Sequence, residues 1–418
     1  MRERLGQDQA VSPVDPPGWK RVPQLLRAVV SGLVVLLVAM GARGSPEAGR
    51  GQLVIAKRVS ARLGVVTAPG YRRYSTPSQG TLLGAINPGV GGKLWFTEIN
   101  TGAVVSISRD GQTHEYPIPW PDSVPEDIVA GPDRRMWFTQ QGIGGIGAIA
   151  QDGVVTNYPV QPTNGEVIGL ALGPDHRLWF TLQYADKIGA ISVTGKVTEY
   201  QVPVANAAPH DIAVGPDGRL WFTEPGVNRI GAITTDGVMT EYNVPTPNAG
   251  VRDIVRGPDG RLWFSEFTAN KIGAITTTGE VTEYDVPTPD AGPHGLTGAY
   301  GVVWFAEQNS GCVALVTPTG VFSTVHLGAR SQPVFVAAGP AGTIWLTEDG
   351  GPSIGVLGRA LVERLTAAAL GGHHGEAGAL SWMRRVERRA LQTSSGSLPV
   401  KSGPQWLLRP PAGGLVSG

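Results

Sequence analysis

Short apolar segments bounded by turn residues recur along the middle of the chain at a nearly constant interval. Each copy contains a variant of the sequence LWFTE, whose aromatic and apolar residues favour a β-strand. Their tryptophans are spaced 42, 42, 42, 42, 41 and 41 residues apart and are Trp95, Trp137, Trp179, Trp221, Trp263, Trp304 and Trp345. Seven copies at this spacing indicate a fold of similar units packed side by side.

Each repeat contains four strand-like segments. In the fourth copy these are DIAVG at 211–215, RLWFTE at 219–224, RIGAIT at 229–234 and VMTEYNV at 238–244. Pro216-Asp217-Gly218 separates the first two segments and Asp236-Gly237 the last two, and both are turn sequences. Four antiparallel strands per repeat, in seven repeats, predict an all-β fold, the seven-bladed β-propeller.

The two ends of the repeat region complement each other. The last copy, residues 333–358, supplies three strands, whereas residues 70–78 align with the fourth strand of an earlier copy at 281–289. We therefore expect an N-terminal strand to complete the last blade. This closure removes two exposed strand edges.

Residues outside the repeat divide the chain further. We expect a basic leader at 1–27, a signal peptide or anchor at 28–44, a linker at 45–71, the propeller at 72–358 and a basic, flexible tail at 359–418. Two segments of the tail, 359–370 and 379–392, are compatible with short helices.

The N-terminal region resembles an export signal. Residues 28–42 contain no charge, and Lys20, Arg21 and Arg27 precede them. A basic flank before an apolar run of 15 residues is typical of a secretory signal, whereas a transmembrane helix needs about 20. We expect a periplasmic or extracellular protein; the alternative is a protein anchored to the membrane by residues 28–42.

Composition and charge exclude several classes. With 59 Gly and 34 Pro the chain is not a long-helix protein, and the single Cys312 excludes a disulfide framework and a cysteine-based zinc site. Residues 76–358 carry 14 basic and 27 acidic residues, whereas both ends are basic. Because an acidic body repels phosphate backbones, we expect no nucleic-acid partner, and membrane contact only through the N-terminal segment.

Candidate site residues lie where strands end at one mouth of the ring. The residue opening the first strand of each blade varies between copies, and reads Gly84, Glu126, Ile168, His210, Arg252, His294 and Val334. The residue ending the second strand reads Glu98, Gln140, Leu182, Glu224, Glu266, Glu307 and Glu348. We expect a polar mouth that holds a small molecule or peptide, with imidazoles as bases, a guanidinium for an anionic group and carboxylates nearby. Because five of the seven copies have glutamate, the alternative is that these carboxylates only belong to the blade consensus.

Three phrases carry a family resemblance: GPDGRLWFTE at 215–224, ANKIGAITTTGEVTEYDVPTPDAGPHGL at 269–296 and VWFAEQNSG at 303–311. Over residues 72–358 the chain resembles the streptogramin B lyases, also called virginiamycin B lyases. The resemblance implies a monomeric, seven-bladed propeller. It also implies an antibiotic-resistance activity, in which a cyclic depsipeptide is opened at its ester by magnesium-assisted elimination.

The resemblance assigns roles to four positions. His294, within Gly292-Pro293-His294-Gly295, matches the general base. The two metal-ligand glutamates of the family fall on Gly292 and Gln308, and a substrate-binding histidine falls on Arg252. Replacing two carboxylates by Gly and Gln removes the charge that would hold magnesium. The pattern therefore predicts a family member with an altered active site.

Two functions remain open at this point. The first is a lyase with His294 as base, and with His210, Glu224 or Glu307 in supporting roles. The second is a non-catalytic propeller that binds a ligand, peptide or glycan at the substrate-binding candidates, which are His210, Arg252, Glu126, Glu224, Glu266, Glu307 and Gln308. A metal-dependent lactonase is disfavoured because the first-strand ring offers only Glu126 as an acidic ligand.

Overall fold

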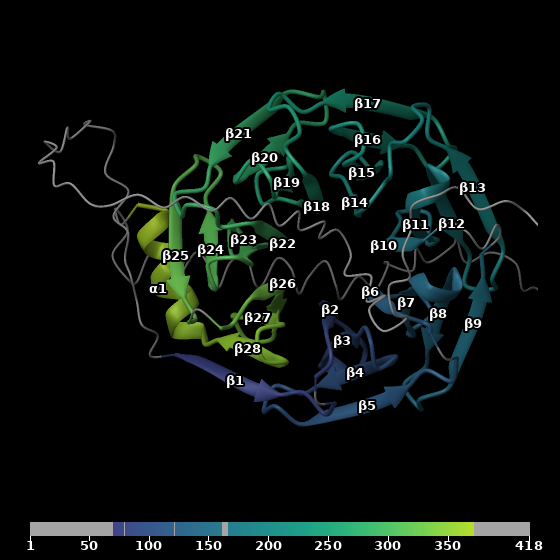
Figure 1. The fold of residues 1–418 in the computed structure, drawn as a ribbon, viewed down its shortest axis with the longest axis horizontal. Helices are drawn as coiled ribbons and strands as arrows, with labels where there is room; N and C mark the ends of the chain where they lie inside the picture. Colours follow the sequence, from purple (N-terminus) through teal and green to yellow (C-terminus); the bar gives the residue numbers. More distant parts are fainter. Residues whose placement is uncertain (1–69, 79, 121, 161–165, 329, 372–418) are drawn as a thin grey trace, which may run out of the picture. The chain divides into compact units, whose positions relative to one another are not determined.

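The computed structural model describes residues 70–78, 80–120, 122–160, 166–328 and 330–371. In this part of the chain, 28 strands form seven four-stranded antiparallel sheets that follow one another around a ring (Figure 1). The predicted seven-bladed β-propeller is confirmed.

The strands of each blade run in order from the channel outward. Blades one to three comprise β2 (Leu83–Pro88), β3 (Leu94–Glu98), β4 (Ala103–Ile107) and β5 (Thr113–Pro117); β6 (Pro125–Ala130), β7 (Met136–Gln140), β8 (Gly145–Ile149) and β9 (Val155–Pro159); and β10 (Val167–Leu172), β11 (Leu178–Leu182), β12 (Lys187–Ile191) and β13 (Val197–Gln201). Blades four and five comprise β14 (Ile212–Val214), β15 (Leu220–Glu224), β16 (Arg229–Ile233) and β17 (Met239–Asn243); and β18 (Val251–Arg256), β19 (Leu262–Glu266), β20 (Lys271–Ile275) and β21 (Val281–Asp285). Blades six and seven comprise β22 (Pro293–Ala299), β23 (Val302–Glu307), β24 (Cys312–Val316) and β25 (Phe322–His326); and β26 (Pro333–Gly339), β27 (Thr343–Glu348), β28 (Ser353–Leu357) and β1 (Tyr71–Ser75). Three short 3-10 helices lie in the loops of blades one to three: η1 (Val90–Gly92), η2 (Gln141–Ile143) and η3 (Gln183–Ala185).

Each blade packs on the next through one tryptophan. Trp263 of blade five lies in a core cluster with Phe305 of blade six, and Trp221 of blade four lies with Phe264 of blade five. The other five blade junctions repeat this pattern, with Leu346 in place of the phenylalanine in blade seven. All seven tryptophans are at most 1% exposed. Because each tryptophan is buried by the neighbouring blade, no blade buries its own apolar faces alone.

The N-terminal strand closes the ring. Strand β1 pairs antiparallel with β28 from Tyr71↔Leu357 to Ser75↔Ser353, so residues 71–75 form the outer strand of blade seven. The alignment of residues 70–78 with the fourth strand of an earlier repeat predicts this position. Tyr74 also stacks on Trp345 with ring centroids 5.9 Å apart. Equivalent outer-strand tyrosines stack on the tryptophans of blades one to five, so β1 reproduces the local packing of those blades.

One predicted boundary needs correction. The sequence assigned residues 359–418 to a flexible tail, but residues 359–369 form helix α1 (Arg359–Ala369), which contacts β25 and β27. Its Leu361, Val362, Leu365 and Ala369 are buried in the cluster that also holds Trp304. An amphipathic stripe with this spacing belongs to a helix packed on a core, so the folded part extends past residue 358.

The predicted leader, signal or anchor segment, most of the linker and the rest of the tail lie outside the described residues. Among the described residues, no helix has the length and apolarity needed to cross a membrane.

In five of the seven blades, the third strand carries a glycine opposite the phenylalanine or leucine of the second strand; Val105 and Ala314 take this position in blades one and six. A Cβ at Gly273 would lie 2.2 Å from the ring of Phe264 on the adjacent strand. We predict that Gly273→Ala lowers the free energy of unfolding by about 1–3 kcal/mol, because the buried phenylalanine has to move. Gly351→Ala is the matched control, since a Cβ there has no atom within 4 Å. Urea unfolding followed by tryptophan fluorescence measures both, and equal effects would contradict this packing argument.

Candidate functional site at the channel mouth

Four polar residues from the starts of inner strands gather at one end of the channel. Glu126, His210 and His294 are 6%, 9% and 7% exposed, and Arg252 is partly buried. His210 and His294 interact electrostatically with each other, with Arg252 and with Asp253. The structure therefore brings together the two imidazoles and the guanidinium that the sequence placed on neighbouring blades.

A bulge at the start of the inner strands directs these side chains. The register of β18 on β19 shifts between Val251 and Ile254, and that of β22 on β23 shifts between His294 and Leu296. An extra residue interrupts the ladder and bends the strand locally, which re-aims the side chains beside it. Arg252 and Asp253 lie inside such a bulge, and His294 borders the next one.

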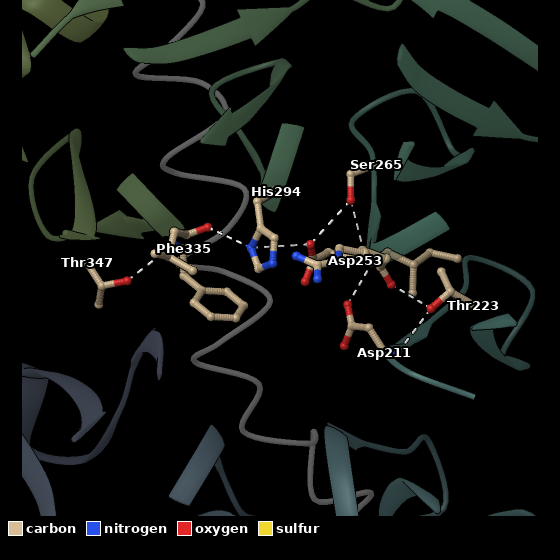
Figure 2. A network of polar contacts seen from close by, with 10 residues as sticks. Asp211, Thr223, Asp253, Ser265, His294, Phe335 and Thr347 are labelled. Carbon is tan, nitrogen blue, oxygen red and sulfur yellow. Dashed lines mark hydrogen bonds and ion pairs between the residues drawn. The ribbon is translucent and has the colours of Figure 1, made fainter. Parts of the chain in front are cut away.

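His294 has a defined orientation and partners. Its Nδ1 lies 3.0 Å from the backbone oxygen of Val334 and 3.6 Å from Oδ2 of Asp253 (Figure 2). In the neutral ring Nδ1–H donates to the Val334 carbonyl, which leaves Nε2 as the basic nitrogen. The rings of Phe335 and Phe267 meet the imidazole edge-on, with centroids 5.1 Å and 6.2 Å away.

Both histidines are neutral at physiological pH. Burial lowers the pKa of His294, and this effect outweighs the opposing influence of Asp253. Burial likewise lowers the pKa of His210 to about 4. Nδ1 of His210 is buried. The mouth thus presents unprotonated imidazoles, which accept protons.

The positive charge at the mouth belongs to Arg252. Its guanidinium lies over the ring of Phe267, 4.6 Å from the centroid, in cation–π geometry. Burial lowers the pKa of Arg252, while Asp253 and Glu126 oppose that shift, and an arginine in this setting keeps its charge. Glu126 accepts a hydrogen bond from Nε2 of Gln141, which follows β7.

The glutamates that end the second strands do not share this pocket. Glu224, Glu266 and Glu307 are 0% exposed, and their carboxylates lie beside groups of the loops and outer strands. Oε2 of Glu307, for example, accepts a hydrogen bond from Ser310 at 2.8 Å, and Oε1 accepts one from Thr288 at 3.2 Å. The expectation that these carboxylates face the channel with the histidines is therefore corrected.

The residues that directly follow the ends of the second strands are the ones that approach the inner strands. Gln141 contacts Glu126, and Phe267 contacts both Arg252 and His294. Neighbouring residues of a strand project in opposite directions, so a shift of one residue changes which group reaches the channel. Gln308 occupies this position in blade six and is partly buried, and its Oε1 has no hydrogen-bond partner among the described residues.

The channel below the mouth is acidic. A cavity of about 340 Å³ is lined by residues of all seven inner strands, with Asn87, Asp127, Asp211 and Asp253 as its polar side chains. Burial, followed by repulsion from Asp253, raises the pKa of Asp127 to about 7 and that of Asp211 well above its usual range. Burial therefore favours the protonated form of Asp127 and Asp211 more than solvent would.

The donor set of the mouth does not fit magnesium. Gly292 has no side chain, and a Cβ built on it would lie 2.5 Å from the side-chain nitrogen of Asn309. Gln308 contributes only a neutral amide. No group of three or more His, Cys, Asp or Glu side chains within the described ranges is arranged to hold a metal ion. Hard divalent cations require several charged or carbonyl oxygens, and the residues here supply too few.

Sequence reasoning missed the aromatic and acidic partners of His294. Phe267 lies in the loop after β19, and Phe335 lies one residue beyond Val334 on the inner strand. A signal was present for the aspartates, since Glu126, His210 and Arg252 are each followed by Asp-Ile. The recurrence of that pair in three blades could have identified the channel-lining position.

Comparisons with known proteins agree with this fold. The model of the virginiamycin B lyase family matches residues 45–249 and 137–367. Among the solved structures that match, a streptogramin B lyase is 32% identical over 68% of this chain and 96% of its own, with a TM-score of 0.66. No curated protein matches the chain.

Two further structures are of virginiamycin B lyase from Staphylococcus aureus. The selenomethionine-substituted enzyme is 34% identical, and the match covers 68% of this chain and 98% of that one with a TM-score of 0.66. A catalytically inactive variant with quinupristin is 32% identical, with the same coverage and TM-score.

Two buried glutamates predict a pH dependence of stability. Burial, then repulsion from Glu241 and Glu283 respectively, raises the pKa of Glu224 and of Glu266 to about 8, and their carboxylates have no hydrogen-bond partner among the described residues. Because the pKa of each glutamate is higher in the folded than in the unfolded chain, the folded state binds these protons more tightly. The resulting contribution to the free energy of unfolding is fully present below about pH 4.5 and is lost as the pH rises through 8.

We predict that Glu224→Gln combined with Glu266→Gln removes this loss. The variant should be more stable than the native chain at pH 8.5 by at least about 1 kcal/mol, and similar to it at pH 4.5. Glu280→Gln, on an exposed side chain, is the control. Urea unfolding at the two pH values measures this, and an effect of equal size at both would show that the glutamates are ionised in the fold.

Proposed function

The chain belongs to the virginiamycin B lyase family, and we propose that it opens a lactone or ester by elimination at the channel mouth. The observation that carries the proposal is the neutral, buried His294, held through Nδ1 by Val334. A base oriented in this way, with its pKa below neutral pH, is ready to accept a proton at physiological pH.

The proposed reaction needs no water. Nε2 of His294 removes a proton from the carbon next to a carbonyl. The released electron pair forms a carbon–carbon double bond as the bond between the neighbouring carbon and the ester oxygen breaks. The ester oxygen leaves as part of a carboxylate, and the imidazolium returns its proton to solvent. The product has the same mass as the substrate.

Arg252 supplies the positive charge in this proposal. The reaction produces a carboxylate, and a guanidinium pairs with a carboxylate through two parallel hydrogen bonds. Phe267 supports the guanidinium on one side and, with Phe335, borders His294. These aromatic walls suit a substrate with apolar groups next to its ester. No step is assigned to magnesium, because the donor set does not fit it.

The N-terminal pattern supports a site of action outside the cytoplasm. The basic flank and apolar run over residues 20–42 are the basis for proposing export.

Turnover of quinupristin tests the proposal. The full chain should convert quinupristin to a product of unchanged mass that carries a new double bond and carboxylate, and EDTA should not slow it. His294→Ala should lower kcat at least 100-fold, since a general base contributes about 10²–10⁴. His114→Ala, at an exposed outer-strand residue, is the control. Mass spectrometry measures the conversion.

Each negative result has its own meaning. Binding of quinupristin without conversion would refute the lyase and favour the non-catalytic propeller. Conversion that persists in His294→Ala would refute the role of His294.

Restoring the two carboxylates should create magnesium affinity. Gly292→Glu combined with Gln308→Glu places acidic groups at both positions, and the exposed side chain of Asn309 can move aside. Non-glycine residues tolerate the left-handed backbone at equivalent positions, as Val124 shows with φ 47°. Calorimetry should detect one Mg²⁺ site in the double variant and none at the mouth of the native chain. Equal affinity in the two proteins would show that the native mouth already holds the ion.

A further inference from the structure

Three blades carry an aspartate at the same place on the inner strand, and two of them use it alike. Oδ1 of Asp211 accepts a hydrogen bond from the amide of Ile212 at 2.8 Å, and Oδ2 accepts one from Ile254 of the next blade at 2.7 Å. Asp127 bonds its own and the next inner strand in the same way, at 2.7 Å each. Both aspartates therefore join neighbouring inner strands.

Asp253, the third member, has different partners. Its Oδ2 accepts a hydrogen bond from the hydroxyl of Ser265 at 3.3 Å and lies 3.6 Å from Nδ1 of His294. Figure 2 shows the carboxylate of Asp253 between Ser265 and His294. The carboxylate is directed to side chains at the mouth instead of to the backbone of the next blade.

Ser265 also departs from its counterparts. The hydroxyls of Thr97, Thr181 and Thr223, at the same strand position, donate to a backbone carbonyl of the following blade at 2.5–2.7 Å. Ser265 accepts from the amide of Asp253 at 3.1 Å and donates to that residue's carboxylate. Serine lacks the methyl group that restricts the χ1 angle of threonine, so its hydroxyl can turn toward Asp253.

We infer that Asp253, held in place by Ser265, is a positioning residue that stabilises the protonated form of His294. The inference rests on the proposed function, in which His294 accepts a proton. At 3.6 Å the carboxylate is too far away for a strong hydrogen bond to the neutral ring, but it attracts an imidazolium directly. The charge thus favours the state formed during proton abstraction, as a buried aspartate does beside a catalytic histidine.

The other groups facing His294 do not replace this charge. Arg252, on the same strand as Asp253, opposes protonation of the ring, and His210 is neutral near pH 7. Phe267 and Phe335 contribute apolar edges. Among the groups that act electrostatically on His294, Asp253 is the anionic one.

Nitrogen NMR of the full chain, with ¹⁵N-labelled histidine, tests the inference without a substrate. His294→Gln assigns the signal. The native ring should be the Nδ1–H tautomer, and Asp253→Asn should lower the pKa of His294 by about one unit. Asp127→Asn is the matched control, because it changes an identically placed aspartate that does not contact His294. Ser265→Ala should shift the pKa in the same direction but by less, with Thr223→Ala as its control.

The outcomes separate this inference from the proposed function. An unchanged His294 pKa in Asp253→Asn, or an equal change in Asp127→Asn, would overturn the role of Asp253. If Asp253→Asn fails to fold, Ser265→Ala decides in its place, and an unchanged pKa there would overturn the role of the pair. With quinupristin, Asp253→Asn should lower kcat at least 10-fold and leave KM within twofold. If the native chain does not convert quinupristin, the proposed function fails while the NMR result still decides the inference.

Discussion

The burial of one tryptophan at each blade junction is the constraint on which the rest of this structure depends. Every such side chain lies against the core of the following blade, and the last junction joins Trp345 to Phe96 of the first blade. A propeller of this kind is complete only when all its junctions are made, because any open junction would expose a large apolar surface. Pairing of β1 with β28 secures the blade at which the ring closes.

The ring lets residues far apart in the sequence act on one another. His210, Arg252 and His294 are about 42 residues apart along the chain, but they open inner strands of consecutive blades and meet at the mouth. The rigid scaffold also carries an electrostatic cost, since buried carboxylates in the channel and behind the second strands have raised pKa values. Polar groups that oppose folding are commonly retained where they serve a site. The channel aspartates fit that pattern better than the second-strand glutamates, because Asp253 contacts His294.

The sequence predicts the architecture well and the site only in part. Constant tryptophan spacing determines the number of blades, and the similarity of residues 70–78 to an outer strand places β1. The same spacing identifies which residues end a strand, but not the direction in which a side chain projects. The pattern therefore predicts Glu224 and Glu266 at the channel, whereas their carboxylates lie beside the outer strands. The sequence allows a helix over 359–369 but does not predict that it packs on the core. Its apolar stripe does not show which cluster the helix covers.

In the proposed mechanism, the mouth acts through the imidazole of His294 and the guanidinium of Arg252 and not through a divalent metal ion. The most direct test is a crystal structure of the full chain with quinupristin and manganese, which stands in for magnesium and gives an anomalous signal. The ester of quinupristin should lie beside Nε2 of His294 and the guanidinium of Arg252, with no manganese signal at the mouth. A manganese ion bound between the ligand and Gln308, or quinupristin bound away from His294, would contradict it.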